Sequence, residues 1–258
     1  MVNIDDCGTT GVGETDWLVY PNTGAGFGPA VRWPIPGADY LGTESVDTLA
    51  SDVYCDPTFE QPAYATLDLD GDARPDLVVT DDCGTTGVGE TDWLVYPNTG
   101  AGFGPAVPWP VPGADYLGTE SVDTLTADVY CDPTFEQPAY ATVDLDVDAR
   151  PDLVVTDDCA STGVGETAWL VYPNTGAGFG PPARWAVPGA DYLGTESVDT
   201  LSADVYCDPT FEQPAYDTVD LDGDGVPELV VVDDCANTGV GEETWLVAYA
   251  QPVCPGRP

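Results

Sequence analysis

The sequence predicts an all-β protein built from repeated antiparallel sheets, and three observations lead to this class. A long segment of the chain recurs at a fixed spacing of 76 residues. Within each copy, short apolar, β-branched and aromatic runs alternate with clusters of Gly, Pro, Asn and Asp, which is typical of strands joined by turns. In addition, no part of the chain carries an apolar stripe with helical spacing over more than about two turns.

The repeat organises the whole chain. The segment DDCGTTGVGETDWLVYPNTGAGFGPAV at 5–31 returns unchanged at 81–107 and with few changes at 157–183, and a more divergent copy begins at Asp233. Self-similarity at a fixed period indicates one structural unit that is used several times. We therefore expect a single repeat domain over residues 1–258. Its expected units are a partial unit 1–64, the complete units 65–140 and 141–216, and a partial unit 217–258.

Four segments of one unit are predicted to be strands. Residues 64–70 (YATLDLD) alternate in polarity, residues 76–82 (DLVVTDD) are β-branched, and residues 92–98 (DWLVYPN) are aromatic and aliphatic. Residues 106–112 (AVPWPVP) are extended but rich in proline, which indicates an edge strand. In the long connection at 113–138 we expect one short strand at most, near ADVYC. Each unit resembles a propeller blade, so we expect a β-propeller-like array of about four four-stranded antiparallel blades, the first and last incomplete.

The tryptophans fall at two positions of the repeat. Those in the WLV strand are expected in the core: Trp17, Trp93, Trp169 and Trp245. The others lie on the proline-rich edge strand: Trp33, Trp109 and Trp185. We expect the second group to seal one blade against the next, as aromatic side chains do in cores. The alternative is that these edge tryptophans stack on a sugar.

The charge of the chain is extreme. Its 46 acidic residues face five arginines, without lysine or histidine, so the formal net charge is −41. Nucleic acid and anionic membrane surfaces are therefore poor partners, because both require positive charge on the protein. The apolar runs are too short to predict membrane insertion. The usual general bases and amine nucleophiles are missing as well, and we expect that the protein is not an enzyme.

A carboxylate-rich loop recurs between the first two strands of the unit. In DLDGDARPD, at 68–76, carboxylates occupy positions 1, 3, 5 and 9, and the carbonyl of position 7 is also available. A cation that takes about six to eight oxygen ligands needs a chain wrapped around it in this way, and Ca²⁺ fits better than Mg²⁺. The alternative is a solvated Asp/Gly turn, but three copies at one place favour about three Ca²⁺ sites. The expected ligands are Asp68, Asp70, Asp72, Arg74 (carbonyl) and Asp76; Asp144, Asp146, Asp148, Arg150 (carbonyl) and Asp152; and Asp220, Asp222, Asp224, Val226 (carbonyl) and Glu228.

The three loops are not expected to bind calcium equally. Position 6 of such a loop needs a positive φ, which suits glycine, but it holds Ala73 and Ala149 in the first two loops and Gly225 only in the third. A residue other than glycine in this conformation costs about 1 kcal/mol. Val147 also replaces glycine at position 4 of the second loop. We therefore predict that the third loop binds best, unless the longer Glu228 offsets the gain.

Two of these motifs together resemble a known family. The loop and strand DLDGDGVPELVV at 220–231, combined with NTGAGFGPA, is similar to the FG-GAP repeat, also called the VCBS-type repeat. Its Phe-Gly pair appears at Phe27-Gly28, Phe103-Gly104 and Phe179-Gly180. The resemblance implies a calcium-binding β-propeller, as in integrin α-subunit heads and bacterial extracellular proteins, with calcium held by the three loops named above. The repeat is longer than is usual in that family, and the units are fewer.

The eight cysteines favour an oxidising compartment, because their number is even and the C-x-x-C pairs or histidines of a zinc site are missing. Their spacing alternates between 48 and 28 residues and ends with a gap of 19, which allows two pairing phases. We expect pairing across the 28-residue gap, since the hairpin formed by the first two strands of the unit brings its own ends together. Pairing across the 48-residue gap, which begins with Cys7–Cys55, is the alternative. The expected disulfides are Cys55–Cys83, Cys131–Cys159 and Cys207–Cys235, with Cys7–Cys254 formed within one chain or between two.

Together these observations predict a non-enzymatic calcium-binding repeat protein with an adhesion or surface-structural role. We expect it to be extracellular or at the cell surface, although MVNIDDCG does not read as a signal peptide. Expected partners are calcium and an extracellular glycan or protein. One alternative is a lectin-like glycan-binding propeller. Another is a filament subunit stabilised by calcium and disulfides, because incomplete units leave strand edges that invite head-to-tail addition.

Overall fold

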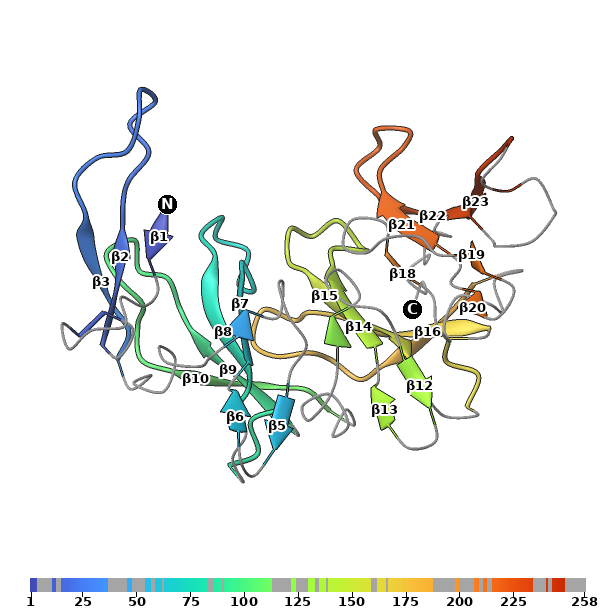
Figure 1. Ribbon diagram of the computed structural model, residues 1–258, viewed down its shortest axis with the longest axis horizontal. Coiled ribbons are helices and arrows are strands. Elements are labelled where there is room, and N and C mark those ends of the chain that lie inside the picture. The colour runs from blue at the N-terminus through green and yellow to red at the C-terminus, as the bar shows by residue number, and fades with distance from the viewer. Residues whose placement is uncertain are drawn as a thin grey trace, which may run out of the picture. The chain divides into compact units, whose positions relative to one another are not determined.

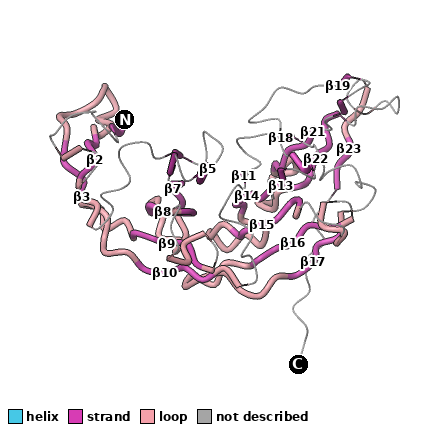
Figure 2. The backbone as a smooth tube through the Cα atoms, turned by 60° about the horizontal axis from the view of Figure 1, so that its bottom comes forward, coloured by secondary structure: helices cyan, strands magenta, loops and turns pink. Residues whose placement is uncertain are grey.

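The part of the chain that the structure describes is all-β. The computed structural model describes residues 1–3, 11–12, 15–36, 46–47, 54–56, 59–61, 63–82, 86–89, 91–112, 122–123, 130–132, 135–137, 139–158, 162–165, 167–187, 198–199, 207–208, 211–212, 215–233, 240 and 243–248. Every regular element in these ranges is a strand, and Figure 2 shows strands joined by loops without a helix. Accordingly, the described residues contain no helix of the length and apolarity that crossing a membrane requires.

One antiparallel sheet recurs along the chain (Figure 1). The two fullest copies have four antiparallel strands each. They are β7 (Ala63–Leu67), β8 (Asp76–Asp81), β9 (Asp92–Tyr96) and β10 (Val107–Pro110), and β14 (Ala139–Val143), β15 (Asp152–Asp157), β16 (Ala168–Tyr172) and β17 (Ala183–Ala186). The copies at either end show β1 (Val2–Asn3), β2 (Asp16–Val19) and β3 (Val31–Pro34), and β21 (Ala215–Val219), β22 (Glu228–Asp233) and β23 (Leu246–Ala248). The predicted repetition of four-stranded antiparallel sheets is confirmed.

The long connection between repeats contains more strands than the sequence predicted. A two-residue strand runs parallel to the first strand of the next sheet, and a short hairpin follows it. These elements are β4 (Val46–Asp47), β5 (Tyr54–Asp56) and β6 (Phe59–Gln61); β11 (Val122–Asp123), β12 (Tyr130–Asp132) and β13 (Phe135–Gln137); and β18 (Val198–Asp199), β19 (Cys207–Asp208) and β20 (Phe211–Glu212). The expectation of one strand at most was wrong. Asp132 pairs with Phe135, so the hairpin is tight. Its signal in the sequence was the proline between the two aromatic segments, because proline favours turns.

The chain divides into two compact units. The N-terminal unit comprises Met1–Ser121 with Tyr172–Pro182, and the C-terminal unit comprises Val122–Val171 with Ala183–Pro258. A core cluster of the N-terminal unit consists of Trp17, Ile35, Tyr64, Leu77, Val79, Tyr96 and Phe103. One in the C-terminal unit consists of Leu145, Val154, Trp169, Val171, Val187, Tyr216 and Val231. Strand β8 is buried along its whole length, which explains its β-branched composition.

Three of the four strand tryptophans lie in the core, as predicted. Trp17, Trp93 and Trp169 are buried, and Trp17 and Trp169 pack against Tyr64 and Tyr216, which lie in the first strand of the next sheet. The prediction was wrong for Trp245, which is 60% exposed. A tyrosine ring covers Trp17 and Trp169, whereas no tyrosine ring on Trp245 is found among the described residues.

Within the N-terminal unit, aromatic side chains connect one repeat to the next. The ring of Phe103 lies edge-on to Trp17, with 5.6 Å between the centroids, and its backbone N–H donates to the carbonyl of Pro34 at 2.9 Å. Phe179 makes the same pair of contacts with Trp93, at 5.3 Å, and with Pro110, at 2.8 Å. The edge tryptophans Trp33 and Trp109 face the same two phenylalanines. These contacts support the predicted role of the edge tryptophans in packing between repeats.

Candidate metal sites

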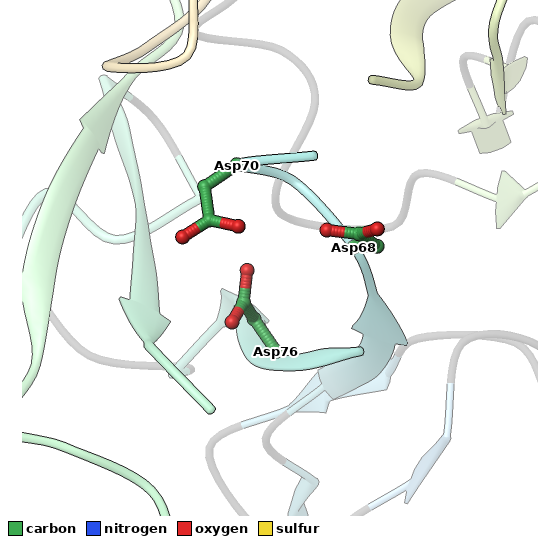
Figure 3. Close-up of side chains that lie close together, drawn as sticks. All are labelled: Asp68, Asp70 and Asp76. Carbon is green, nitrogen blue, oxygen red and sulfur yellow. The ribbon is translucent and has the colours of Figure 1, made fainter. Parts of the chain in front are cut away.

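The first acidic loop connects β7 to β8 and gathers three carboxylates. Asp68, Asp70 and Asp76 each offer an oxygen, and these oxygens all lie within 4.8 Å of one another. Figure 3 shows the three side chains turned toward a common space. Asp68 directly follows β7, Asp70 lies in the loop, and Asp76 begins β8. Carboxylate oxygens so grouped are the donors that a hard divalent cation prefers.

The first carboxylate of the loop also shapes its backbone. One Asp68 oxygen accepts the N–H groups of Gly71 at 2.9 Å and Asp72 at 3.0 Å, and the other accepts the N–H of Ala73 at 2.7 Å. Aspartate commonly holds a turn in this way. The chain is thereby curled so that alternate side chains point inward.

Asp76 is the most constrained carboxylate of the site. It is 1% exposed, accepts the N–H of Asn98 at 2.8 Å, and accepts the N–H of Leu69 at 3.3 Å. Burial raises the pKa of Asp76 to about 6, and the charges of Asp70 and Asp72 add to the rise, although the two backbone hydrogen bonds oppose it. A buried carboxylate surrounded by carboxylates is stabilised by a cation. The donor set therefore fits Ca²⁺.

In the first two loops, the carboxylate at position 5 forms an ion pair with an arginine. Asp72 forms an ion pair with Arg74, and Asp148 forms one with Arg150. The sequence predicted only the carbonyls of these arginines as ligands, and it missed that their side chains compete for the carboxylate. The third loop has Val226 at the equivalent position. Its carboxylates therefore have no neighbouring guanidinium at that position, which agrees with its predicted higher affinity.

The second and third loops also gather three carboxylates each, but at positions 1, 3 and 5 and without position 9. Their clusters are Asp144, Asp146 and Asp148, and Asp220, Asp222 and Asp224, again with one oxygen from each residue within 4.8 Å of the others. Position 9 is buried in both: Asp152 accepts the N–H of Leu145 at 3.2 Å, and Glu228 accepts the N–H of Leu221 at 2.8 Å. Burial, followed by the charges of Asp148 and Asp144, raises the pKa of Asp146 above its ordinary value.

The structure thus brings most of the predicted carboxylates together. Asp72, Asp152 and Glu228 lie in the same loops but outside the three clusters. The carbonyls of Arg74, Arg150 and Val226 stay predicted ligands. The predicted disulfides fall outside the described side chains. Only the backbones of Cys55, Cys131 and Cys207 are placed, in β5, β12 and β19.

Sequence reasoning missed two asparagines that support the first loop. Asn98 donates its side-chain N–H to the carbonyl of Pro75 at 2.8 Å and accepts the Nε–H of Arg74 on its own carbonyl at 2.9 Å. Asn174, which is buried, donates its side-chain N–H to the carbonyl of Leu69 at 3.0 Å. Both begin the Asn-Thr-Gly sequence of the repeat. Its recurrence beside every Phe-Gly pair was the available signal.

The predicted positive φ is confirmed at position 6, where φ is 65° at Ala73, 71° at Ala149 and 93° at Gly225. Position 4 is also left-handed, with Val147 at 62°. We expect Ala73→Gly, Ala149→Gly and Val147→Gly each to raise the free energy of unfolding by about 1 kcal/mol, because glycine adopts this conformation without a steric penalty. Urea denaturation in the presence of calcium measures the change.

A matched control is Ala25→Gly, since Ala25 is exposed and is not among the described residues with positive φ. This substitution should give no gain, because glycine only adds freedom to the unfolded chain. A gain at Ala25 equal to that at Ala73 would contradict the strain argument.

The raised pKa of Asp76 predicts a pH dependence of the metal-free fold. The folded chain binds this proton more tightly than the unfolded chain, so the stabilisation is complete below about pH 4 and is lost as the pH rises through about 6. In EGTA, the free energy of unfolding of the wild type minus that of Asp76→Asn should fall between about pH 5 and about pH 7. Denaturation series at both pH values measure this difference. A constant difference would show that Asp76 does not titrate in this range.

Comparisons with known proteins do not identify a family. No family model matches the chain, and no curated protein matches it, so the resemblance to FG-GAP repeats stays a prediction. A Tc holotoxin pore of Photorhabdus luminescens is similar in structure with a TM-score of 0.44 and 20% identity, over 92% of this chain and 8% of that chain. A lectin of Agrocybe aegerita that recognises non-reducing terminal N-acetylglucosamine is similar with a TM-score of 0.46 and 16% identity, over 85% and 42%. The chain spans less than half the length of either, and such TM-scores do not define a shared fold.

Proposed function

We propose that the protein is a non-enzymatic calcium-binding repeat protein of the cell exterior, in which three acidic loops bind Ca²⁺ and hold the sheets in their folded form. The observation that carries the proposal is the first cluster, in which the buried Asp76 lies within 4.8 Å of two further carboxylates. Such a group is stabilised by a bound cation far more than by solvent. The clusters of the other two loops, formed by the partly or fully exposed carboxylates at positions 1, 3 and 5, extend the proposal to about three sites.

The net charge gives calcium a second role. A chain with a formal net charge of −41 repels itself when it is compact. Each bound Ca²⁺ removes two negative charges from a loop where they are most concentrated. The folded state, which brings these carboxylates together, therefore gains more from the cation than the unfolded chain does. Millimolar calcium outside the cell would keep such loops occupied, which supports an extracellular location.

We further propose that the repeated sheets are blades of a β-propeller-like array that serves adhesion or a surface structure. The repetition of one sheet and the aromatic packing between repeats in the N-terminal unit support this reading. An extracellular glycan or protein is the proposed partner in an adhesion role. Two of the three edge tryptophans give a sugar little to stack on, because Trp109 is buried and Trp33 is half-buried against Phe103.

Sedimentation velocity at low protein concentration tests the proposal. In millimolar calcium the wild type should sediment as a compact particle of 27.0 kDa, and in excess EGTA its frictional ratio should rise. Asp220→Asn, which removes a ligand from the third loop, should need more calcium for the same compaction. An identical frictional ratio in calcium and in EGTA would overturn the proposal that calcium holds the fold.

A further inference from the structure

One turn of the repeat docks on the neighbouring repeat in two of its three copies. We call these segments FG turns: the first is 21–28, the second 97–104 and the third 173–180, each with the sequence PNTGAGFG. The surface that receives one consists of two cross-strand tryptophans and the residue after the second of them, and we call it a socket. The first socket is Trp17, Trp33 and Pro34; the second is Trp93, Trp109 and Pro110; the third is Trp169, Trp185 and Ala186.

The first FG turn presents to solvent the surface that its copies bury. Phe27 is 61% exposed, whereas Phe103 is 8% and Phe179 is 4% exposed. The space around the glycine before each phenylalanine differs in the same way. A Cβ at Gly102 or Gly178 would lie 2.8 Å from the Cδ of Pro34 or Pro110, whereas a Cβ at Gly26 would meet nothing within 4 Å.

The exposed turn already has the docked conformation. Gly24 and Gly100 both have φ of 78°, and Gly26 and Gly102 have φ of 150° and 147°. The closing hydrogen bond is conserved as well, since the Gly28 N–H donates to the carbonyl of Pro21 at 2.8 Å, as Gly104 does to Pro97 at 2.7 Å. A turn that is formed before binding loses little conformational entropy on docking. The turn itself carries no charged side chain.

The third socket has the geometry of the other two. Trp169 lies opposite Trp185 across β16 and β17, as Trp93 lies opposite Trp109 across β9 and β10. Trp185 is half-buried, and Ala186 is exposed. Among the described residues, neither a phenylalanine ring at Trp185 nor a backbone N–H on the Ala186 carbonyl is found. In the sequence, the position one repeat after Phe179 holds Pro255.

We propose that the first FG turn of one chain docks in the third socket of a second copy, so that the chains associate head to tail. Phe27 would lie edge-on to the half-buried Trp185 of the second copy, and its N–H would donate to the carbonyl of the exposed Ala186; Trp169, 6% exposed, lies beneath this contact. Because the contact joins two different surfaces, each dimer leaves one turn and one socket open for further chains. The inference goes beyond the proposed function, since it rests on aromatic packing and not on metal binding.

The third FG turn predicts a further contact of this interface. Asn174 donates to the carbonyl of Leu69, which lies in the acidic loop of the preceding repeat. The equivalent donor on the first FG turn is Asn22, and the equivalent acceptor is the carbonyl of Leu145 in the second acidic loop. The contact therefore combines an aromatic anchor with one buried hydrogen bond, the arrangement by which small interfaces become specific.

Concentration-dependent sedimentation in calcium tests the interface. The sedimentation coefficient of the wild type should rise with protein concentration. Phe27→Ala should weaken the association by about tenfold or more, because truncating a central aromatic anchor removes most of a hot spot. Val31→Ala is the matched control, since Val31 is an exposed apolar residue of β3 outside the FG turn. Association that is equally weak in both variants, or unchanged in both, would overturn the proposal.

A photo-crosslinking residue at position 27 identifies the surface that is contacted. In a mixture of ¹⁵N-labelled and unlabelled chains, products should join chains of different label and map to the peptide that contains Trp185. Products confined to single chains would show that the turn closes on its own molecule, and products at any other surface would point to another site. Either result would overturn docking in the third socket of a second copy. The readout does not require calcium to be the stabilising ion, so it is independent of the metal proposal.

Discussion

In excess EGTA the free energy of unfolding should be lower by about 4 kcal/mol than in about 1 mM calcium. A site with a dissociation constant of about 0.1 mM, as in extracellular modules, contributes about 1.4 kcal/mol at this concentration, and three sites contribute about 4. That is a large share of the net stability of a domain. Urea denaturation followed by tryptophan fluorescence measures the difference, because Trp17, Trp93 and Trp169 are buried in the folded chain.

Two controls make this result specific to the loops. The triple variant Asp68→Asn, Asp144→Asn, Asp220→Asn removes position 1 from each loop and should unfold at nearly the same urea concentration in calcium and in EGTA. Magnesium at the same concentration should restore little stability to the wild type, since Mg²⁺ gives up its waters reluctantly. Equal stability of the wild type in calcium and in EGTA would contradict the account.

Phe103→Ala and Phe179→Ala should each lower the free energy of unfolding by about 3–5 kcal/mol. Both side chains are buried, and each lies edge-on to a tryptophan of the preceding repeat. Truncation leaves a cavity where two repeats meet and removes the aromatic pair, so the loss includes a cavity term and a contact term. Denaturation in calcium measures it.

Phe27→Ala is the matched control for these two variants, because the same residue in the same turn is 61% exposed. At protein concentrations that keep the chain monomeric, its free energy of unfolding should change by less than about 0.5 kcal/mol. A loss at Phe27 as large as that at Phe103 would show that the stability resides in the turn and not in packing between repeats.

Much of the fold could be predicted from the sequence, because repetition multiplies weak signals. Alternation at 64–70 and the β-branched run at 76–82 each predicted a strand, and the structure has strands at Ala63–Leu67 and Asp76–Asp81. The acidic loops were recognisable because their spacing recurs between the same two strands. The short parallel strand β11 was not predictable, since two residues carry no period and pair only because the tertiary fold brings them to the edge of β14.

The site was predictable in its carboxylates but not in their supports. Asp68 and Asp70 could be predicted as metal ligands from the carboxylates at every second position of the loop. That Arg74 turns back onto Asp72, and that Asn98 and Asn174 hold the loop, depends on where the turns of two repeats lie in space. Likewise, the exposure of Phe27 and Trp245 could not be told from their buried copies, since the local sequence is nearly the same and only the neighbouring repeat differs.

Isothermal titration with calcium tests the central claim most directly, because it counts the ions that the loops bind. The account predicts about three Ca²⁺ per chain for the wild type, loss of the tightest site in Asp220→Asn, and no saturable binding in the triple variant. The triple variant also controls for diffuse binding of cations to an acidic surface. Absence of saturable binding to the wild type, or the same stoichiometry in the triple variant, would contradict the claim that these loops are calcium sites.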